Sequence, residues 1–418
     1  MPETRSPSVL FVNQNYYPDL VSAGQRLTDL AEYLAEGGFD VSVICGRGGY
    51  EGESEKAPLR ETRNGVDIRR VRTPNFGRSS TLGRIADYAA FFVQALGIVL
   101  AHSTPDLVVT LTTPPLVNLV GLATRTLKGQ SYGIWSMDLH PDGEKALGMI
   151  PKRSILTSAL DGLNNAAHRK ADFVVALGRH MAERIEAKGV ESESLKILPM
   201  WTKGMHEVPD EENPYRGQFG LQDRFVVLYA GNAGLFHQFE EICDCMRRFK
   251  NHEDVYFLFV GDGPRRGEIE AYARQHRIEN FEYRDYVPRE DLKYVLSLAD
   301  VHLLSLRPKI SGIAVPSKLY DSMMSARPVV MVGPRSSETA QTIEEGEFGF
   351  VVDPSEKEQG AVSDGLVEAL ETLYNDPNLR AEMGEAGASL YSQEYDRDVV
   401  CQQWSRLLRD RIRRSLSD

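Results

Sequence analysis

Short apolar segments alternate with helical patterns along most of this chain of 418 residues, and this alternation limits its possible folds more than any other feature. The chain opens with a segment typical of a strand, Ser8–Asn13, followed by an amphipathic helix over Gln25–Glu36 and a second strand at Val41–Cys45. A strand–helix–strand unit implies neighbouring parallel strands, with ligands bound beyond their carboxyl ends. The sequence therefore predicts an α/β fold whose binding residues follow the strands.

The chain is too long for a single hydrophobic core, and its length predicts two domains of roughly 200 residues each. A charged segment with prolines, Lys203–Gln222, predicts a linker, and a second strand–helix series begins after it at Arg224–Ala230. We expect residues 1–203 to form one Rossmann-like domain, residues 204–395 a second, and residues 396–418 a terminal helix.

Charge and cysteine content exclude several classes of partner. A net charge of −12 argues against nucleic acid, which requires a basic surface. The four cysteines show neither the spacing of a disulfide framework nor a metal-binding pattern, so reduced thiols in the cytoplasm are expected. The N-terminal apolar segment fits a short strand, and for this reason no signal peptide is expected.

Two segments bear on membrane contact. The longest apolar segment, Tyr88–Ala101, is interrupted by Gln94 and is too short to span a bilayer, which predicts a buried helix. Docking on a membrane surface is the alternative. The C-terminal arginines indicate either a solvated helix end or a patch for anionic lipid. They are Arg406, Arg409, Arg411, Arg413 and Arg414. A cytoplasmic protein is expected, with peripheral contact at the inner membrane face left open.

The segment Ser311–Gly333 predicts a loop, a short helix and a buried strand. Pro316 cannot continue a preceding helix, and Ser317 is a good N-cap for a helix that begins at Lys318. Backbone N–H groups at a helix N-terminus bind anions, and Lys318 adds a positive charge there. Asp321 shares a helix face with Ser317, so its carboxylate can accept from the two hydroxyls of a ribose. An ordinary capped helix, with Asp321 favouring the dipole, is the alternative.

Several longer motifs occur in the order of a known enzyme family. They are PDLVVTLTTPPL (Pro105–Leu116), WSMDLHPDGEKALG (Trp135–Gly148), YAGNAG (Tyr229–Gly234), the segment Val260–Leu304 that begins VGDGPRRG, and VPSKLYDSMMSARPVV (Val315–Val330). With them the chain resembles glycosyltransferases of family 4, which are retaining nucleotide-sugar transferases of the GT-B fold. The resemblance extends to a subgroup that adds amino or deoxy sugars to bacterial polyprenyl-linked saccharides.

The resemblance implies two facing Rossmann-like domains, with the last helix crossing back to the first domain. It implies transfer of a sugar from a nucleotide-diphosphate donor, expected to be a UDP-sugar, to a saccharide or polyprenyl-linked acceptor. The setting is assembly of cell-surface polysaccharide, including lipopolysaccharide and its O-antigen. The nucleotide-sugar is a co-substrate, and no cofactor is expected.

The resemblance also implies which residues bind the donor. Asp321 replaces the family's ribose-binding glutamate, and Glu338 resembles a second acidic position near the nucleoside. Val287 lies in the segment that reads the base, and Gly24 in a first-domain loop whose backbone meets the donor phosphate. The remaining positions are in the loops that surround the diphosphate. They are Gly231, Asn232, Val315, Pro316, Ser317 and Leu319.

Two departures from the family pattern carry information. Ile313 stands where the family has a glutamate that binds hydroxyls of the donor sugar, which suggests a deoxy or N-acetylated sugar. Asn232 and Gln238 stand where the family often has an Arg and a Lys. Lys318 and Arg307 are therefore assigned to neutralise the leaving diphosphate.

The chemistry requires stabilisation of negative charge on the departing phosphate. A helix N-terminus with one or two cations suits this task without a metal, and no Asp-x-Asp at a strand end requires one. Asp138 ends a first-domain strand and is assigned a catalytic contact to the sugar or the acceptor hydroxyl, with turn capping as the alternative. His140 and Arg26 are acceptor candidates, although a packed histidine and a surface arginine are the simpler interpretations.

Two other functions remain open. A nucleotide-sugar 2-epimerase of the same fold is disfavoured because no acidic cluster is expected opposite Lys318. A degenerate nucleotide-sugar-binding protein is suggested by Ile313 and Asn232, but the presence of Asp321, Lys318 and Asp138 argues against it.

Overall fold

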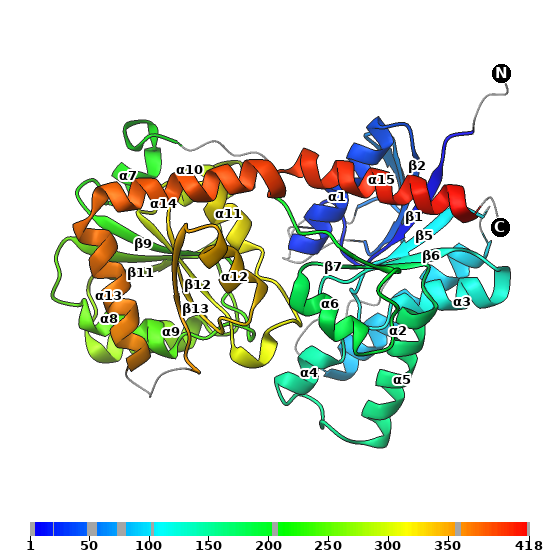
Figure 1. Ribbon diagram of the computed structural model, residues 1–418, viewed down its shortest axis with the longest axis horizontal. Coiled ribbons are helices and arrows are strands. Elements are labelled where there is room, and N and C mark those ends of the chain that lie inside the picture. The colour runs from blue at the N-terminus through cyan, green and yellow to red at the C-terminus, as the bar shows by residue number, and fades with distance from the viewer. Residues whose placement is uncertain are drawn as a thin grey trace. The chain divides into compact units, whose positions relative to one another are not determined.

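The computed structural model describes residues 5–19, 21–47, 57–72, 81–101, 104–202, 208–355 and 361–415 (Figure 1). The chain forms two compact units, each built on its own sheet. Unit 1 comprises Met1–Met200 and Arg397–Asp418, and unit 2 comprises Trp201–Asp396. The chain leaves unit 2 beside the point where it enters, because Thr202 and Asp396 form a parallel bridge and Tyr391 donates to the Thr202 carbonyl at 2.9 Å.

Unit 1 is organised around a sheet in the order β3-β4-β2-β1-β5-β6-β7-β8, in which only β3 is antiparallel to its neighbour. Its strands are β1 (Ser8–Val12), β2 (Asp40–Cys45), β3 (Arg60–Arg63), β4 (Val66–Arg70), β5 (Leu107–Thr110), β6 (Tyr132–Trp135), β7 (Phe173–Ala176) and β8 (Leu195–Ile197). The strand order reverses between β1 and β5, so the crevice of this sheet lies beyond the ends of those strands. There the Gln14 N–H donates to the Thr113 carbonyl at 2.7 Å.

Helices cover both faces of the unit 1 sheet. They are α1 (Ser22–Glu36), α2 (Thr81–Ala101), α3 (Asn118–Lys128), α4 (Asp142–Ala146), α5 (Ile155–Lys170), α6 (Arg179–Glu186) and α15 (Arg397–Ser415). Right-handed crossovers place α2, α3 and α5 on the face opposite α1. The contacts agree with this arrangement, since α3 packs against α2 and α5 while α1 packs against α15.

Unit 2 contains a fully parallel sheet in the order β11-β10-β9-β12-β13-β14. Its strands are β9 (Phe225–Ala230), β10 (Val255–Val260), β11 (Phe281–Arg284), β12 (Val301–Ser305), β13 (Val329–Val332) and β14 (Gly349–Val352). The order reverses between β9 and β12, which places the ligand crevice of unit 2 at the loops that follow these two strands.

Alternating residues of β9 and β10 face two separate cores, as expected for strands buried on both sides. Val227 and Phe259 belong to the larger core, whereas Val226 and Leu258 belong to the smaller one. The helices of unit 2 are α7 (Pro214–Gln218), α8 (Glu240–Arg248), α9 (Arg266–His276), α10 (Leu292–Leu296), α11 (Lys318–Met324), α12 (Glu338–Glu345), α13 (Ala361–Asn375) and α14 (Pro377–Leu390). Shorter turns are η1 (Asp210–Glu212), η2 (Arg289–Asp291), η3 (Pro308–Ile310) and the π-helical η4 (Tyr391–Tyr395).

The expected linker is wrong for its described part. Residues 203–207 lie outside the described ranges, but η1 and α7 follow and belong to unit 2. Asn213 donates to the Tyr294 carbonyl at 2.7 Å, and the Val208 N–H donates to Ser297 at 3.0 Å. The charged, proline-containing composition of this segment therefore belongs to short helices packed on unit 2 and not to a linker.

The expectation that the long apolar helix is buried is also wrong. α2 is buried along one stripe, formed by Asp87, Phe91, Ala95 and Val99 at intervals of four residues. By length and composition the segment Gly83–Ala101 could cross a membrane, yet only 22% of its apolar window is buried inside the protein. Apolar composition predicted the helix but not which side of it faces the core.

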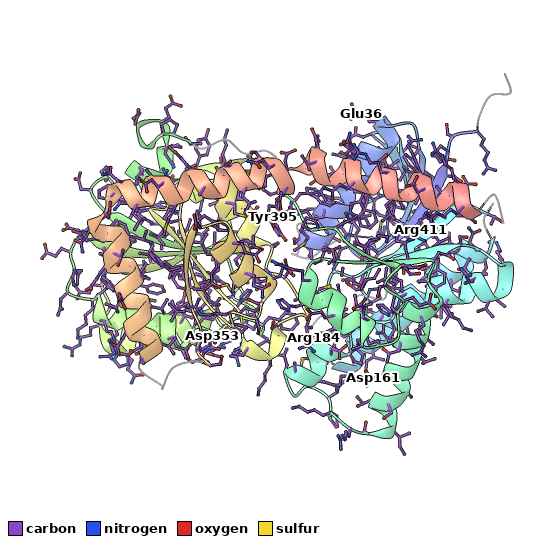
Figure 2. The ribbon with its side chains drawn as sticks, in the orientation of Figure 1. Glu36, Asp161, Arg184, Asp353, Tyr395 and Arg411 are labelled. Carbon is purple, nitrogen blue, oxygen red and sulfur yellow. The ribbon has the colours of Figure 1, made fainter. Side chains whose placement is uncertain are left out.

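The C-terminal helix α15 packs on unit 1, as the resemblance implied. Trp404 is fully buried against Trp135, with ring centroids 4.7 Å apart. Arg409 donates to the Gly37 carbonyl at 2.8 Å, and Arg411, labelled in Figure 2, donates to the Glu193 carbonyl at 3.3 Å. These two arginines therefore bind the protein itself rather than forming a solvated helix end.

Replacing Trp404 tests this docking. Trp404→Ala is expected to lower the free energy of unfolding by about 3–5 kcal/mol, because it removes a large buried side chain from a closely packed contact. Urea denaturation followed by circular dichroism measures the change. The exposed Gln402 on the same helix provides the control, since Gln402→Ala should change stability by no more than about 0.5 kcal/mol. Equal stability of the two variants would contradict the docking.

Candidate active site

The crevice of unit 2 begins at Gly231, directly after β9. Gly231 has a positive φ of +113°, and a Cβ atom there would lie 2.8 Å from the Cε of Lys318. A side chain at this position would both strain the backbone and displace the lysine. The glycine therefore gives Lys318 its place beside the β9 loop.

Lys318 is held by the loop that follows β9. Its ammonium donates to the Asn232 carbonyl at 2.9 Å and to Nε2 of His237 at 3.2 Å, and it lies 4.8 Å from the ring centroid of Tyr229. Burial lowers the pKa of Lys318 to about 7, and the nearby Asp321 carboxylate offsets this only in part. Lys318 thus gains or loses its charge near neutral pH.

His237 ties the two crevice loops together. Its Nδ1 lies 2.6 Å from the Ser305 carbonyl at the end of β12, so Nδ1 carries the proton and Nε2 accepts from Lys318. Burial and the charge of Lys318 lower the pKa of His237 to about 3, which keeps the ring neutral at physiological pH. The sequence interpretation missed this residue, because it considered only Asn232 and Gln238 in this loop.

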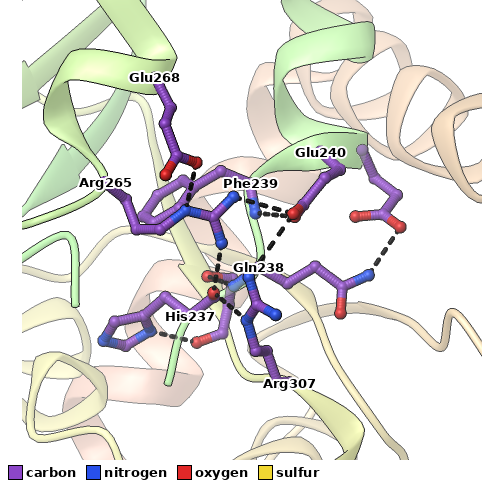
Figure 3. Close-up of polar contacts among 9 residues, drawn as sticks. His237, Gln238, Phe239, Glu240, Arg265, Glu268 and Arg307 are labelled. Atoms are coloured by element: carbon purple, nitrogen blue, oxygen red, sulfur yellow. Dashed lines mark hydrogen bonds and ion pairs between the residues drawn. The ribbon is translucent and has the colours of Figure 1, made fainter. Parts of the chain in front are cut away.

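The main chain of His237 also orders two arginines (Figure 3). Its carbonyl accepts from Nε of Arg307 at 2.9 Å and lies 3.5 Å from Nη1 of Arg265. Glu240 at the start of α8 pairs with both guanidinium groups, at 2.8 Å from Arg265 and 3.5 Å from Arg307. Arg265 is held further by Glu268 at 2.7 Å. One loop residue thus connects Lys318, Arg307 and Arg265, and the sequence interpretation had predicted the first two.

The predicted segment around α11 lies at the same edge of the sheet, with one correction. Ser317 takes the N-cap position, but its backbone is already helical and its side chain makes no capping hydrogen bond, so the predicted cap is wrong. Pro316 is half-buried, whereas Val315, Leu319 and Ile313 are buried. The Leu319 N–H already donates to the Pro316 carbonyl at 3.3 Å, so a contact between this residue and a ligand stays a prediction.

The remaining donor candidates also follow strands of unit 2. Asp321 lies within α11, one turn after Lys318. Glu338 is the first residue of α12, whose N-cap Ser337 accepts from the Ala340 N–H. Val287 lies after β11 and packs against the smaller core. These positions agree with their predicted places along the chain, while their contacts with a nucleotide stay predictions.

Gly24 in unit 1 was predicted to lie in a loop, but it is the third residue of α1. A Cβ at Gly24 would lie 3.1 Å from the backbone carbon of Asn15 and 3.2 Å from the nitrogen of Tyr16. The glycine therefore lets the loop after β1 pack closely on the helix. Arg26 is only 4% exposed, so its interpretation as a surface arginine is wrong.

Asp138 follows β6 at the carboxyl edge of the unit 1 sheet. Its N–H donates to Oγ1 of Thr112 at 3.2 Å, which connects the ends of β5 and β6. Burial raises the pKa of Asp138, although the nearby His140 opposes this. The structure thus brings Asp138 and His140 together, as adjacent positions after the strand suggested.

His140 is held by Glu144 from the short helix α4, which was not predicted. Nδ1 of His140 lies 2.7 Å from Oε1 of Glu144. Burial lowers the pKa of His140, but the hydrogen bond and charge of Glu144 outweigh it, so the pKa is raised overall. Lys145 of α4 pairs with Asp142 and Asp161, which fixes the helix locally. Asp138, His140 and Glu144 therefore form a coupled acid–base group.

Comparison with protein families identifies both units. The model described as "Glycosyl transferase 4-like domain" matches residues 23–201, and that described as "Glycosyl transferases group 1" matches residues 224–376. The chain belongs to the GT-B glycosyltransferases. Together the two matched segments contain most of the chain and every strand of the two sheets except β1.

Named relatives of this glycosyltransferase extend over most of its length. It is 25% identical to a probable glycosyltransferase, WbjE, from Pseudomonas aeruginosa over 70% of this chain and 73% of the relative. It is also 25% identical to WcaI from Escherichia coli, a putative colanic acid biosynthesis glycosyl transferase, over 80% of this chain and 86% of that protein.

Solved structures show the same fold at lower identity. A sucrose-phosphate synthase from Thermosynechococcus elongatus has a TM-score of 0.77 and 15% identity, with 97% of this chain and 98% of that chain covered. The Anabaena protein HepE in complex with UDP-glucose has a TM-score of 0.72 and 16% identity, with 96% and 99% covered. Two Rossmann-like units of the GT-B type are therefore confirmed.

Removing the carboxylate charge of Glu144 tests the acid–base group of this glycosyltransferase. Glu144→Gln is expected to lower the pKa of His140, because burial then acts without an opposing negative charge. Titration of the histidine resonances by NMR measures it, with His140→Asn identifying the signal. Glu183→Gln, beside His180, is the control and should leave His140 unchanged. A His140 pKa that does not fall in Glu144→Gln would contradict this arrangement.

Proposed function

We propose that this glycosyltransferase moves a sugar from a UDP-sugar to a saccharide or polyprenyl-linked acceptor, with retention at the anomeric carbon. The observation that carries the proposal is the holding of Lys318 and Arg307 by His237 at the crevice of unit 2. It is supported by the HepE complex with UDP-glucose and by the name of WcaI, which refers to polysaccharide biosynthesis. The proposed setting is cell-surface polysaccharide assembly in the cytoplasm.

Lys318 and Arg307 act on the leaving diphosphate in this proposal. As the glycosidic bond to the donor phosphate breaks, negative charge grows on that phosphate and the two cations stabilise it. A single preorganised donor of this kind is worth about 3 kcal/mol of the barrier. Because the two side chains are already ordered by His237, the enzyme does not have to arrange them during the reaction. We propose that this cation pair takes the place of a metal ion.

Lys318 also responds to the arrival of the donor. At neutral pH its ammonium is only partly populated, since burial lowers its pKa to about 7. A diphosphate beside Nζ favours the charged form, so donor binding draws a proton onto Lys318. Asp321 and Glu338 are proposed to contact the ribose and the nucleoside, as the family resemblance implies.

Asp138 and His140 are proposed to face the reacting sugar and its acceptor. Burial raises the pKa of Asp138, and Glu144 raises that of His140, so both groups hold protons more readily than in water. An acid–base pair of this kind can orient an acceptor hydroxyl or hold its proton. Arg26 and Gly24 remain candidates for contacts with the phosphates of acceptor and donor.

Ile313 is proposed to select the donor sugar. The side chain is buried at 2% exposure and carries no hydrogen-bonding group. A sugar hydroxyl placed against it would lose a partner that a carboxylate provides. A deoxy or N-acetylated sugar fits this surface better than a fully hydroxylated hexose.

A donor panel tests the proposed function. Thermal shift with UDP-, GDP- and ADP-sugars should show a clear rise in melting temperature for UDP-sugars, because only a ligand of the folded state stabilises it. Lys318→Met is expected to lose most of this rise. Asp138→Asn should keep it and lose turnover with an acceptor by roughly a hundredfold.

Three results of activity assays with the same donors would contradict the proposal. The first is unchanged turnover in Asp138→Asn. The second is UDP release and epimerised sugar in the absence of any acceptor, which would indicate the 2-epimerase alternative. The third, a fully hydroxylated hexose donor with the highest kcat/KM, would contradict the role of Ile313.

The pH dependence of UDP binding tests the state of Lys318. Since Lys318 is mostly neutral at pH 8 in the free protein, UDP binding there should take up close to one proton, and UDP affinity should fall by roughly tenfold between pH 6.5 and 8.5. Calorimetry in two buffers of different ionisation enthalpy measures the uptake. Lys318→Arg is the control, because its guanidinium stays charged and should bind UDP without taking up a proton. Equal proton uptake in both proteins would contradict the role of Lys318.

A further inference from the structure

Exposed apolar side chains are concentrated on one side of unit 1. The described part of the chain has twelve exposed large apolar side chains, and seven of them lie on α2, α3, α5 or the loop before α5. They are Ile85, Val93, Leu127, Met149, Ile155, Leu156 and Leu163. We call the outer surface of these helices and of the loop 147–154 the α2–α5 face.

The three helices of this face form one layer. Each follows a strand of the parallel sheet and crosses in the same direction along it, so right-handed connections place all three on the same side. α3 packs against α2 and also against α5. The surfaces that these helices turn away from the sheet therefore point to the same side of unit 1.

The start of α5 is the most exposed part of the face. Ile155 is 93% exposed and Leu156 is 69% exposed, and only Ser154 separates them from the exposed cations Lys152 and Arg153. Met149 precedes these cations and is 52% exposed. The segment Gly148–Leu160 contains no acidic residue. Two exposed cations thus lie between exposed apolar side chains along the segment from Met149 to Leu156.

The charge of the face is opposite to that of the whole protein. Residues 81–101, 118–128 and 148–170 contain seven Lys or Arg residues against two Asp and no Glu, in a chain of net charge −12. One of the seven cations, Arg125, pairs with Asp172 just after α5 at 2.5 Å. Asp87 is buried, and Asp161, labelled in Figure 2, accepts from Lys145 at 2.8 Å.

Two other sites of membrane contact, a membrane-spanning α2 and a lipid-binding patch at the C-terminus, agree less well with the structure than the α2–α5 face does. α2 does not act as a separate spanning segment, since Phe91, Ala95 and Val99 are buried and Gln94 accepts from the Arg72 N–H at 3.0 Å. The C-terminal arginines are not the stronger cationic surface, because Arg409 and Arg411 bind carbonyl groups of unit 1.

We propose that the α2–α5 face docks on a bilayer that contains anionic lipid. Side chains such as Ile155 and Leu156 enter the interface between headgroups and acyl chains, while Lys152 and Arg153 meet the lipid phosphates. Charge complementarity favours this occupant, since a second copy of the face would oppose positive charge with positive charge. The inference does not rest on the proposed function, because membrane binding needs neither donor nor acceptor.

Vesicle co-sedimentation of the full chain tests the proposal. We expect binding to vesicles of one-third phosphatidylglycerol and two-thirds phosphatidylcholine, little binding to phosphatidylcholine alone, and release at high salt. The double variant Ile155→Ser/Leu156→Ser should reduce the bound fraction by roughly tenfold or more, since these exposed side chains supply the apolar contact. Lys152→Glu/Arg153→Glu should reduce it on anionic vesicles in a similar way.

Matched variants and a size measurement make the outcomes decisive. Ile197→Ser removes an exposed apolar side chain from β8, and Arg406→Glu reverses an exposed charge on α15. Both should bind vesicles like the native chain, and all variants should keep the native melting temperature. Binding lost equally in the control variants, no binding to anionic vesicles, or a dimer in light scattering that disappears in Ile155→Ser/Leu156→Ser would overturn the proposal.

Discussion

The candidate site depends on the imidazole of His237, which lies between β9 and β12, two strands that are neighbours in the sheet but far apart in the sequence. The strand order of the unit 2 sheet reverses between β9 and β12, so the loops that follow these two strands lead away from each other. His237, in the loop after β9, joins the two loops through a hydrogen bond to the Ser305 carbonyl at the end of β12. The same residue accepts from Lys318 through its ring and from Arg307 through its main chain. A fold-level constraint, the change in strand order, is thereby converted into a fixed arrangement of cations.

This arrangement balances burial against charge. Lys318 is desolvated enough for its pKa to approach neutrality, whereas Arg265 is satisfied by two carboxylates and Arg307 by one. The group in unit 1 is balanced in the opposite sense, because Glu144 raises the pKa of His140 against the effect of burial. In unit 2, Lys318 is poised to become charged when an anion binds beside it. In unit 1, Asp138 and His140 hold their protons more tightly than they would in water. Glycosyl transfer to a hydroxyl acceptor needs both properties.

The sequence predicted the features that depend on local pattern and missed those that depend on distant contacts. Buried strands such as β9 and β13 are continuous apolar segments, and Lys318 follows a proline and a serine that signal a helix start. The exposed edge strand β3 and the short helix α4 lack such patterns. Helix α8 has a clear amphipathic pattern, with Ile242, Cys243, Cys245 and Met246 buried, and was nevertheless missed. His237 was missed because its role comes from Ser305, 68 residues later. The burial of α2 was wrongly predicted because an apolar sequence can face either a core or another surface.

A crystal structure with bound UDP is the most direct test of the central claim, that the loops joined by His237 hold the leaving diphosphate. The account predicts the diphosphate beside Gly231, with Nζ of Lys318 within hydrogen-bonding distance of a phosphate oxygen and His237 still bound to Ser305. A nucleotide bound elsewhere, with Lys318 still donating only to Asn232 and His237, would contradict it.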